Sequence, residues 1–351
     1  MKVKIDNVNI VGIATCVPER VVDIFDNKLI YNGDISKLKR IVDSTGFHKR
    51  HILQINSTTT AGDMCYEAAE KLIDATNTNK NDIGAIIMLT QYPDYFEPAT
   101  ACVLHGKLNL DQQCIAFDIN QGCAGYIYGL LVASKLVSKD KKILLLCGDT
   151  GSRALGTQED IIDDMPIFGD GVCATILEYS ENANTIYFNL ENDGKKSDVL
   201  CFKNGGFRNP PNKTMFKSDG SFDYGNYMDG LAVFEFTMNT VPQSINNILD
   251  FANKQDADID YYILHQANKM ILETIAVSAK ISANKVLRNT LSRYGNLSSA
   301  SVASVLCDEY EKFNQKECRI VLNAFGVGLS WGSALLELKN TLCLPIIFYE
   351  E

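Results

Sequence analysis

Short apolar runs alternate with amphipathic segments along this chain, and the pattern occurs twice. The run Ala85–Leu89 follows an Asp-Ile pair and an amphipathic segment, and Tyr261–Leu264 has the same surroundings in the second half. Further along each half, the run Ile143–Leu146 has its counterpart in Ile320–Leu322. Short aliphatic runs bounded by polar residues are typical of buried strands, so we expect a strand at each of these four positions.

A helix is predicted between the two strands of each half. These helices span Ala124–Val137 and Ala300–Phe313, and corresponding segments lie about half a chain length apart. Such a repeat favours a duplicated α/β unit, and strands that alternate with helices predict mainly parallel central sheets. We place the two halves at residues 1–178 and 179–351, with chance similarity between short strand motifs as the alternative.

Composition narrows the function classes. The 351-residue chain is 46% hydrophobic and 22% charged, which is typical of a folded globular protein. Its net charge of −10 argues against a nucleic-acid surface. No apolar run reaches the ~20 residues that a membrane span needs. The start of the chain, up to an expected first strand at Val8–Ile13, has no signal-like character. We therefore expect a cytoplasmic protein with no membrane partner.

Eleven cysteines are distributed over the chain. Their number is odd, none forms a Cys-x-x-Cys pair, and most lie in apolar runs, as do Cys102, Cys147, Cys173 and Cys307. This usage predicts small buried side chains in a reducing compartment, and it favours neither a disulfide framework nor a zinc site.

One cysteine has different surroundings. Cys123 lies in the segment Gly122–Gly125, where small residues allow a tight strand-to-helix turn and the close approach of a substrate. The N–H groups at a helix N-terminus stabilise a thiolate, which lowers the pKa of the thiol, and they can also hold a developing oxyanion. Cys123 is therefore a candidate nucleophile, and a buried structural cysteine is an equally weighted alternative.

Two polar residues of the second half occupy comparable positions. His265 follows the expected strand Tyr261–Leu264 and precedes a helix that starts near Asn268. Asn296 follows a glycine and precedes the next helix. Functional groups gather beyond the carboxyl ends of strands in α/β sheets, so both residues can share a site with Cys123. The alternatives are a buried core histidine and an asparagine that caps a helix N-terminus.

Two glycine-rich segments accompany these residues. Phe168–Val172 predicts a tight turn that leads into a strand, and Asn323–Ser330 follows the expected strand Ile320–Leu322. The second segment can offer a backbone N–H beside the nucleophile. Neither matches a dinucleotide-binding or phosphate-binding fingerprint.

Together these segments resemble the 3-oxoacyl-[acyl-carrier-protein] synthase III family of the thiolase superfamily. The motifs are spread over nearly the whole chain and occur in order: Thr45–Ile52, the Cys123 turn, Phe168–Gly171, His265–Asn268, Tyr294–Asn296 and Trp331–Leu335. The resemblance implies a five-layered αβαβα thiolase-like fold built from two similar halves and an obligate homodimer. It also implies that Cys123, His265 and Asn296 are the catalytic residues.

The resemblance further implies a two-stage reaction of lipid metabolism, such as fatty acid biosynthesis. In the first stage, Cys123 takes an acyl group from an acyl-CoA or acyl-carrier-protein thioester, and the backbone N–H groups of Cys123 and Val327 hold the oxyanion. In the second stage, a malonyl thioester on an acyl carrier protein loses CO2. His265 and Asn296 stabilise the resulting enolate, which attacks the acyl-enzyme. Neither a cofactor nor a metal is implied.

Several positions depart from the family pattern, and most concern the substrate. Arg40 and Ser44 stand where members primed by acyl-CoA commonly have a tryptophan and an arginine that stack the adenine. Met270 replaces an arginine linked to carrier-protein docking. An aromatic residue usually projects across the dimer into the partner's acyl pocket, and here that position is Glu97, beside Phe96.

The pocket candidates are therefore Phe325, Phe96 and Glu97, and Val327 adds bulk where the family has a glycine. We expect a specialised member and not the housekeeping initiator of fatty acid synthesis. It would take its acyl group from a carrier protein or carry an unusual acyl chain. An acidic carrier protein needs a local basic surface, for which the sequence offers only scattered candidates: Lys269, Arg208, Lys213 and Lys217.

Three other function classes fit parts of the pattern. A papain-like protease also uses cysteine, histidine and asparagine in this order, but Cys123 lies far from the N-terminus and lacks the surroundings typical of that class. An acyltransferase that passes the acyl group to an oxygen or nitrogen nucleophile needs the same residues, and CO2 release separates it from a condensing enzyme. A non-catalytic partner subunit would not need all three groups.

Overall fold

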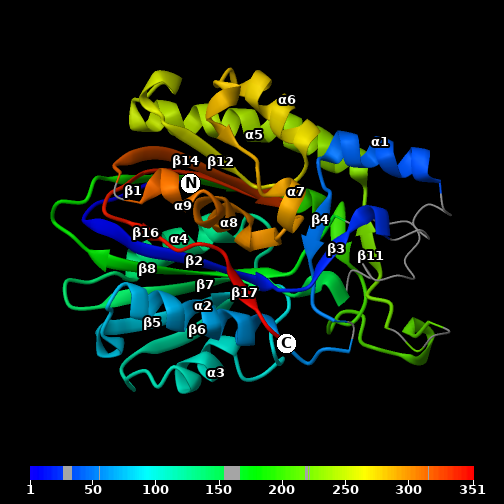
Figure 1. Ribbon diagram of the computed structural model, residues 1–351, viewed down its shortest axis with the longest axis horizontal. Coiled ribbons are helices and arrows are strands. Elements are labelled where there is room, and N and C mark those ends of the chain that lie inside the picture. The colour runs from blue at the N-terminus through cyan, green and yellow to red at the C-terminus, as the bar shows by residue number, and fades with distance from the viewer. Residues whose placement is uncertain (27–33, 55, 154–166, 218–219, 221, 315) are drawn as a thin grey trace.

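The computed structural model describes residues 1–26, 34–54, 56–153, 167–217, 220, 222–314 and 316–351. Two β-sheets and the helices around them form five layers, in the order helix, sheet, helix, sheet, helix (Figure 1). This arrangement confirms the αβαβα fold class predicted from the sequence.

The first sheet has the strand order β16-β2-β8-β7-β5-β6, and β17 also pairs with β2. Within it, β5 is parallel to β6 and β7, whereas β8 is antiparallel to β7 and β2. The bounds are β2 Val8–Pro18, β5 Ile83–Leu89, β6 Ile115–Ile119, β7 Lys142–Asp149, β8 Gly171–Tyr179, β16 Leu342–Cys343 and β17 Ile347–Tyr349.

The second sheet has the strand order β1-β9-β15-β14-β12-β13. Here β12 is parallel to β13 and β14, whereas β15 is antiparallel to β14 and β9. The bounds are β1 Lys2–Ile5, β9 Ile186–Asn192, β12 Tyr261–Leu264, β13 Val286–Leu287, β14 Cys318–Gly326 and β15 Ser330–Leu338.

The two sheets share one pairing pattern, which supports the duplication inferred from the sequence. In each, three parallel strands are followed by two antiparallel ones. The prediction of mainly parallel sheets is therefore wrong for β8 and β15. Parallel neighbours need a long crossover, but antiparallel strands can be joined by a tight turn. The turn from Gly326 to Ser330 joins β14 directly to its neighbour β15.

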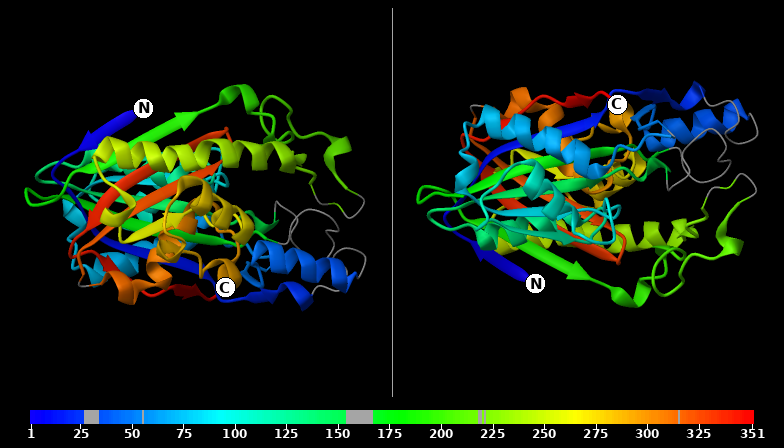
Figure 2. Two further views of the ribbon diagram at one scale, coloured as in Figure 1. Left: turned by 90° about the horizontal axis from the view of Figure 1, so that it is seen from above. Right: turned by 90° about the horizontal axis from the view of Figure 1, so that it is seen from below.

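Helices fill the layer between the two sheets (Figure 1), and others cover the two outer faces (Figure 2). The middle layer holds α4 (Gly125–Leu136) and α8 (Ser301–Asp308), whose buried side chains share one core with both sheets. The outer helices are α2 (Ala61–Ala75) and α3 (Thr100–Lys107) on the first sheet, and α5 (Gly230–Ala252) and α6 (Lys269–Ala279) on the second. Among the described helices, none is both long and apolar enough to cross a membrane.

The helix expected over Ala300–Phe313 is interrupted. It forms α8 and then a short α9 (Tyr310–Phe313), because the backbone leaves helical geometry at Glu309. The helix expected to start near Asn268 is confirmed: Asn268 caps α6 through a hydrogen bond from the backbone N–H of Ile271 to its side chain, 2.8 Å long.

The remaining elements lie largely at one end of the molecule. Figures 1 and 2 show α1 and the paired strands β10 and β11 extending beyond the two sheets at the same end. These elements are α1 Ile35–Thr45, α7 Leu291–Tyr294, β3 Val21–Asp23, β4 Lys49–His51, β10 Leu200–Phe202 and β11 Asn226–Met228.

The two ends of the chain cross between the halves. β1 pairs with β9 in the second sheet, and β16 and β17 pair with β2 in the first. The division at residues 178 and 179 falls at the end of β8 and stays a prediction. All eleven cysteines are free. Cys147, Cys173 and Cys307 are buried as predicted, but Cys102 is exposed, because it lies on the outward side of the outermost helix α3.

Candidate active site

The candidate nucleophile lies between the end of β6 and the start of α4. Cys123 is half-buried, and the turn that contains it is closed by a 2.7 Å hydrogen bond from the N–H of Gly125 to the carbonyl of Gly122. A β-carbon added to Gly326 would lie 2.8 Å from Cβ of Cys123 and 3.2 Å from its Sγ. The turn between β14 and β15 therefore packs directly on the nucleophile, at a position where only glycine fits.

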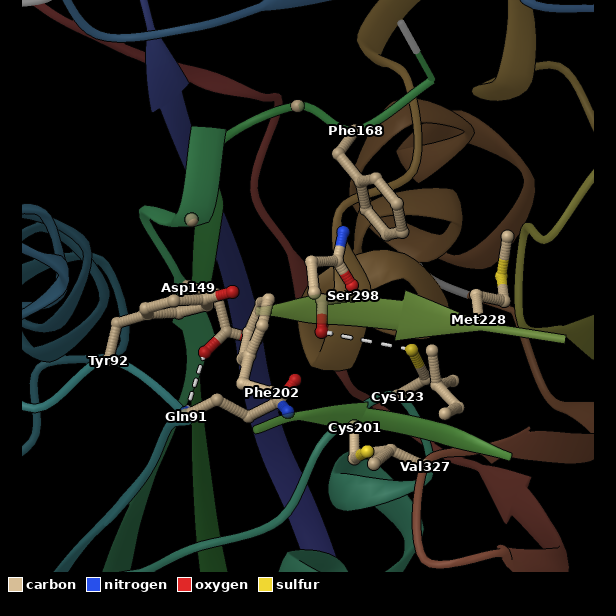
Figure 3. Close-up of a pocket in the computed structure, with 14 residues that line it drawn as sticks. Gln91, Tyr92, Cys123, Asp149, Phe168, Cys201, Phe202, Met228, Ser298 and Val327 are labelled. Carbon is tan, nitrogen blue, oxygen red and sulfur yellow. Dashed lines mark hydrogen bonds between the residues drawn. The ribbon is translucent and has the colours of Figure 1, made fainter. Parts of the chain in front are cut away.

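A cavity opens over Cys123 (Figure 3). Its lining comes from the turn around Cys123, the loops after β5 and β7, and the strands β10 and β11. The glycine-rich segments Phe168–Val172 and Asn323–Ser330 and the segment of Ser298 also contribute. The lining residues are Gln91, Tyr92, Cys123, Asp149, Gly151, Phe168, Gly169, Leu200, Cys201, Phe202, Asn226, Met228, Ser298 and Val327. Most of this surface is apolar, as a site for an acyl chain requires.

Val327 stands beside the nucleophile, as the sequence predicts. Its Cγ1 lies 2.3 Å from the place that a β-carbon on Gly122 would occupy. Val327 and Cys123 both line the cavity, and they lie in turns that follow strands of the two different sheets. The role of their N–H groups in binding an oxyanion stays a prediction.

His265 follows β12 and is 3% exposed. Its Nδ1 lies 2.7 Å from the hydroxyl oxygen of Ser301, and its ring meets that of Phe325 at 5.4 Å between centroids in an edge-to-face contact. Burial lowers the pKa of His265 to about 4, so the imidazole is neutral at pH 7. If Ser301 donates to Nδ1, the proton of the neutral ring lies on Nε2.

Asn296 is held by its backbone and by its side-chain oxygen. Its N–H donates to the carbonyl of Ile167 at 2.7 Å, and its own carbonyl accepts from Gly169 at 3.0 Å. Its Oδ1 accepts a 2.9 Å hydrogen bond from the N–H of Ser298. Asn296 is not the N-cap of a helix, because Leu297 and Ala300 hold those positions before the 3-10 turn Ser298–Ala300 and α8. Its amide oxygen closes a local turn instead, and the NH2 group is left as the donor for another partner.

Neighbouring residues connect the three candidates. Phe325 touches the ring of His265, and the next residue, Gly326, touches Cys123. On the other side, Asn296 holds the backbone of Ser298, whose hydroxyl lies 3.9 Å from Sγ of Cys123. The end of β14 and the segment of Ser298 therefore contact the candidate nucleophile, whereas His265 is linked to it through Phe325 and Gly326. His265 and Asn296 are not among the residues that line the described cavity, and their catalytic role stays a prediction.

The pocket candidates are distributed differently. Phe325 is 4% exposed and packs on His265, and it is not among the residues that line the described cavity. Phe96 is 84% exposed, and Glu97 beside it is also exposed, so in the single chain both lie on the surface. Instead, the apolar lining comes largely from β10 and β11, whose short strands carry no motif in the sequence.

The pKa of the Cys123 thiol differs from the one that the sequence predicts. A helix N-terminus was expected to lower the pKa of its thiol, but burial raises it to about 11, and the nearby Asp149 carboxylate adds to the increase. The hydroxyl of Ser298 opposes the shift without cancelling it. Cys123 is therefore a neutral thiol at pH 7 and must lose a proton when it attacks.

Comparisons with known proteins agree with this geometry. Residues 117–194 match the family described as 3-oxoacyl-[acyl-carrier-protein (ACP)] synthase III. Residues 249–338 match the family described as the C-terminal part of the same synthase. A Campylobacter jejuni protein with the provisional name 3-oxoacyl-[acyl-carrier-protein] synthase 3 is 37% identical over 100% of this chain and 99% of its own length. The chain belongs to the 3-oxoacyl-[acyl-carrier-protein] synthase III family.

Two further similarities extend over most or all of the chain. The beta-ketoacyl-[acyl-carrier-protein] synthase III of Campylobacter fetus is 33% identical over 94% of this chain and 98% of its own. The crystal structure of a 3-oxoacyl-(acyl-carrier protein) synthase from Burkholderia xenovorans superposes with a TM-score of 0.90, at 31% identity over 100% of this chain and 99% of that one. Members of this family are acyl-transferring condensing enzymes, so the chain is a transferase of the thiolase-like fold.

Proposed function

We propose that this enzyme forms an acyl-Cys123 intermediate and condenses it with a malonyl thioester carried by an acyl carrier protein, releasing CO2 and a 3-oxoacyl product. The observation that carries the proposal is the largely apolar cavity over the half-buried Cys123. A neutral, buried His265 packs on Phe325, one residue before the glycine that contacts Cys123. A neutral imidazole can donate a hydrogen bond to an enolate without adding a full charge.

In the first stage, Sγ of Cys123 attacks the carbonyl carbon of an acyl thioester, and the thiol of the donor leaves. The backbone N–H groups of Cys123 and Val327 hold the oxyanion of the tetrahedral intermediate. The packing of Gly326 on Cys123 supports this role, because it fixes the turn that carries Val327 against the nucleophile.

In the second stage, His265 and Asn296 donate to the thioester oxygen of the malonyl group while its carboxylate leaves as CO2. Ser301 orients the ring of His265, and Ser298 occupies Oδ1 of Asn296, so each residue presents a donor. The enolate carbon then attacks the acyl carbonyl on Cys123. The thiolate of Cys123 leaves and is reprotonated.

We also propose that the donor is an acyl-carrier thioester or an unusual acyl group, in a homodimer. Arg40 and Ser44 are exposed on α1 without the aromatic residue that would stack an adenine. The exposed Phe96 and Glu97 would reach the partner's pocket in such a dimer. Basic docking candidates are exposed at the start of α6 (Lys269) and between β10 and β11 (Arg208, Lys213 and Lys217).

The test is intact mass after incubation with a panel of acyl-CoA and acyl-carrier thioesters, followed by a malonyl-carrier thioester with capture of CO2. We expect one acyl adduct, which disappears as CO2 and a 3-oxoacyl product form. The second candidate is transfer to an oxygen or nitrogen nucleophile, which needs the same residues. An adduct that forms normally but releases no CO2 would favour that transfer and contradict the condensation.

A further inference from the structure

Asp149 is a buried carboxylate that the condensation mechanism does not use. It ends β7 and is 3% exposed. Its Oδ1 accepts hydrogen bonds from the hydroxyl of Thr90 at 3.0 Å and from the N–H of Gln91 at 2.8 Å, whereas Oδ2 has no hydrogen-bond partner among the described residues. A buried carboxylate oxygen without a partner is costly, so it calls for a functional explanation.

Ser298 lies between this carboxylate and the nucleophile. Its hydroxyl is 3.9 Å from Sγ of Cys123. This hydroxyl and the backbone N–H of Ser299 both face Asp149 closely enough to favour the charged carboxylate, without closing a hydrogen bond to Oδ2. The backbone of Ser298 is left-handed, with φ at 50°, and Asn296 holds it there. Figure 3 shows Cys123, Ser298 and Asp149 in one cavity. Strained backbone of this kind is often found at functional sites.

We propose that Ser298 and Asp149 form a proton relay for Cys123: when Sγ attacks the acyl carbonyl, Asp149 takes up the thiol proton through the hydroxyl of Ser298. Ser298 is then a catalytic residue, and Asp149 is a positioning residue that acts through it. The inference rests on the proposed acyl-Cys123 chemistry and adds to it the route of the proton.

The relay accounts for every proton that moves during acylation. As the bond between Sγ and the acyl carbon forms, the Cys123 proton moves to Oγ of Ser298 and the hydroxyl proton moves to Oδ2 of Asp149. When the bond from the acyl carbon to the donor sulfur breaks, the proton returns through Ser298 to the leaving thiolate. Thiol and thioester have exchanged, and both relay groups are restored.

The groups that face Asp149 are consistent with this task. The titratable ones are Cys123, Tyr92 from the loop after β5, Cys65 from α2, and Cys147 from β7 itself. Burial raises the pKa of each of them, so all four are neutral at pH 7. Burial also raises the pKa of Asp149 above that of an ordinary carboxyl group, which makes it a better proton acceptor.

The test uses the full chain and p-nitrophenyl acetate, a small acyl donor that needs no carrier recognition. The first-turnover release of p-nitrophenolate is measured against pH, with Cys123→Ala as the blank for other nucleophiles. We expect Asp149→Asn to lower the rate at pH 7 about 100-fold, within the range of general-base catalysis, and to abolish the acidic limb of the profile. Asp256→Asn is the matched control, because it makes the same carboxylate-to-amide change at a residue that accepts hydrogen bonds from the N–H and hydroxyl of Ser282. It should change neither the rate at pH 7 nor the acidic limb.

The outcome separates the relay from two other roles. If Asp149 only repels the thiolate, Asp149→Asn should speed the reaction. If His265 is the proton acceptor, the acidic limb should persist in Asp149→Asn and vanish in His265→Ala. Either result overturns the relay.

A second variant covers the case in which Asp149→Asn fails to fold, as judged by circular dichroism. Ser298→Ala should slow the burst by a similar factor, and an unchanged burst in Ser298→Ala would overturn the relay. Failure of the proposed condensation would look different, because the burst would remain without CO2 release from a malonyl thioester. Absence of any Cys123-dependent burst in the unmodified chain would count against both.

Discussion

The duplicated fold places two comparable turns on the site, and their chemistry differs. In the first half, the turn from β6 to α4 carries Cys123, and the helix after it is continuous and mostly buried. In the second half, the chain from β13 to α8 carries Asn296 and then a run of buried serines: Ser298, Ser299, Ser301 and Ser304. One turn carries the candidate nucleophile, and the other carries hydroxyl and amide groups, of which the Ser298 hydroxyl faces Cys123.

The difference shows how a repeat can build an asymmetric site. The paired sheets bring both helix starts to one place, but only side chains decide what each contributes. Ser298 reaches Cys123 and Ser301 reaches His265, so the serine-rich turn serves two residues from other elements. The duplicated backbone sets the positions, and the divergence between the halves produces the chemistry.

The largest effect should come from the first turn. Cys123→Ala should abolish the covalent acyl adduct, because no other described residue of the cavity combines a thiol with the two candidate oxyanion N–H groups. Intact mass after incubation with an acyl thioester measures it. Cys102→Ala, at the exposed cysteine of α3, is the matched control and should retain the full adduct. An adduct that survives in Cys123→Ala would place the nucleophile elsewhere.

The second-largest effect should come from Asn296, whose amide oxygen binds Ser298 and whose NH2 group is the proposed donor to the enolate. Asn296→Asp keeps an oxygen for the N–H of Ser298 but removes the NH2 donor. Condensation should fall about 100- to 1000-fold, the usual cost of losing one oxyanion donor, while the fold is retained. The rate of CO2 release measures condensation, and thermal unfolding measures whether the fold is retained. If Asn296 only closes the turn to Ser298, Asn296→Asp should condense normally and Asn296→Ala should lose stability instead.

The strands that carry this comparison were predictable from the sequence. The apolar runs at β5, β7, β12 and β14 are long enough to identify buried strands without tertiary information. The strand expected after Phe168–Val172 is β8, but its antiparallel direction does not follow from the sequence, because periodicity indicates that a strand exists and not how its neighbour runs. No strand is predicted from the sequence at β15. The break at Glu309 was missed since nothing in the local sequence ends the helix there.

The site was predictable only in part, for a physical reason. Cys123, His265 and Asn296 stand beside glycines or at strand ends, and these local signals can be read in one dimension. Asp149 also stands beside a glycine at a strand end, but a carboxylate after a strand and a serine in a turn are ordinary at a surface, so neither Asp149 nor Ser298 is singled out by the sequence. Only the burial that tertiary packing creates shows that they matter.

A smaller effect should come from the contact between the two halves. Gly326→Ala puts a β-carbon 2.8 Å from Cβ of Cys123, so one of the two turns must shift. We expect acylation to slow about tenfold and the free energy of unfolding to fall by about 1–3 kcal/mol. Burst kinetics and denaturant unfolding measure these changes. Gly206→Ala, where a β-carbon meets nothing within 4 Å, is the matched control. Equal behaviour of the two variants would mean that the contact does not set the geometry of the nucleophile.

The smallest effect concerns the hydroxyl that orients His265. Ser301→Ala removes the 2.7 Å hydrogen bond to Nδ1, so the neutral ring no longer favours the form protonated at Nε2. The loss of about 1 kcal/mol corresponds to about fivefold slower condensation, with acylation unchanged. Nitrogen NMR of the imidazole rings should show the tautomer shift directly, and His265→Gln assigns its signal among the four histidines. Ser304→Ala, one turn further along α8, removes a hydroxyl whose one hydrogen bond among the described residues goes to the carbonyl of Ser301. If both variants slow condensation equally, the effect belongs to the packing of α8; if only Ser301→Ala does, the serine-rich turn acts on the chemistry through His265.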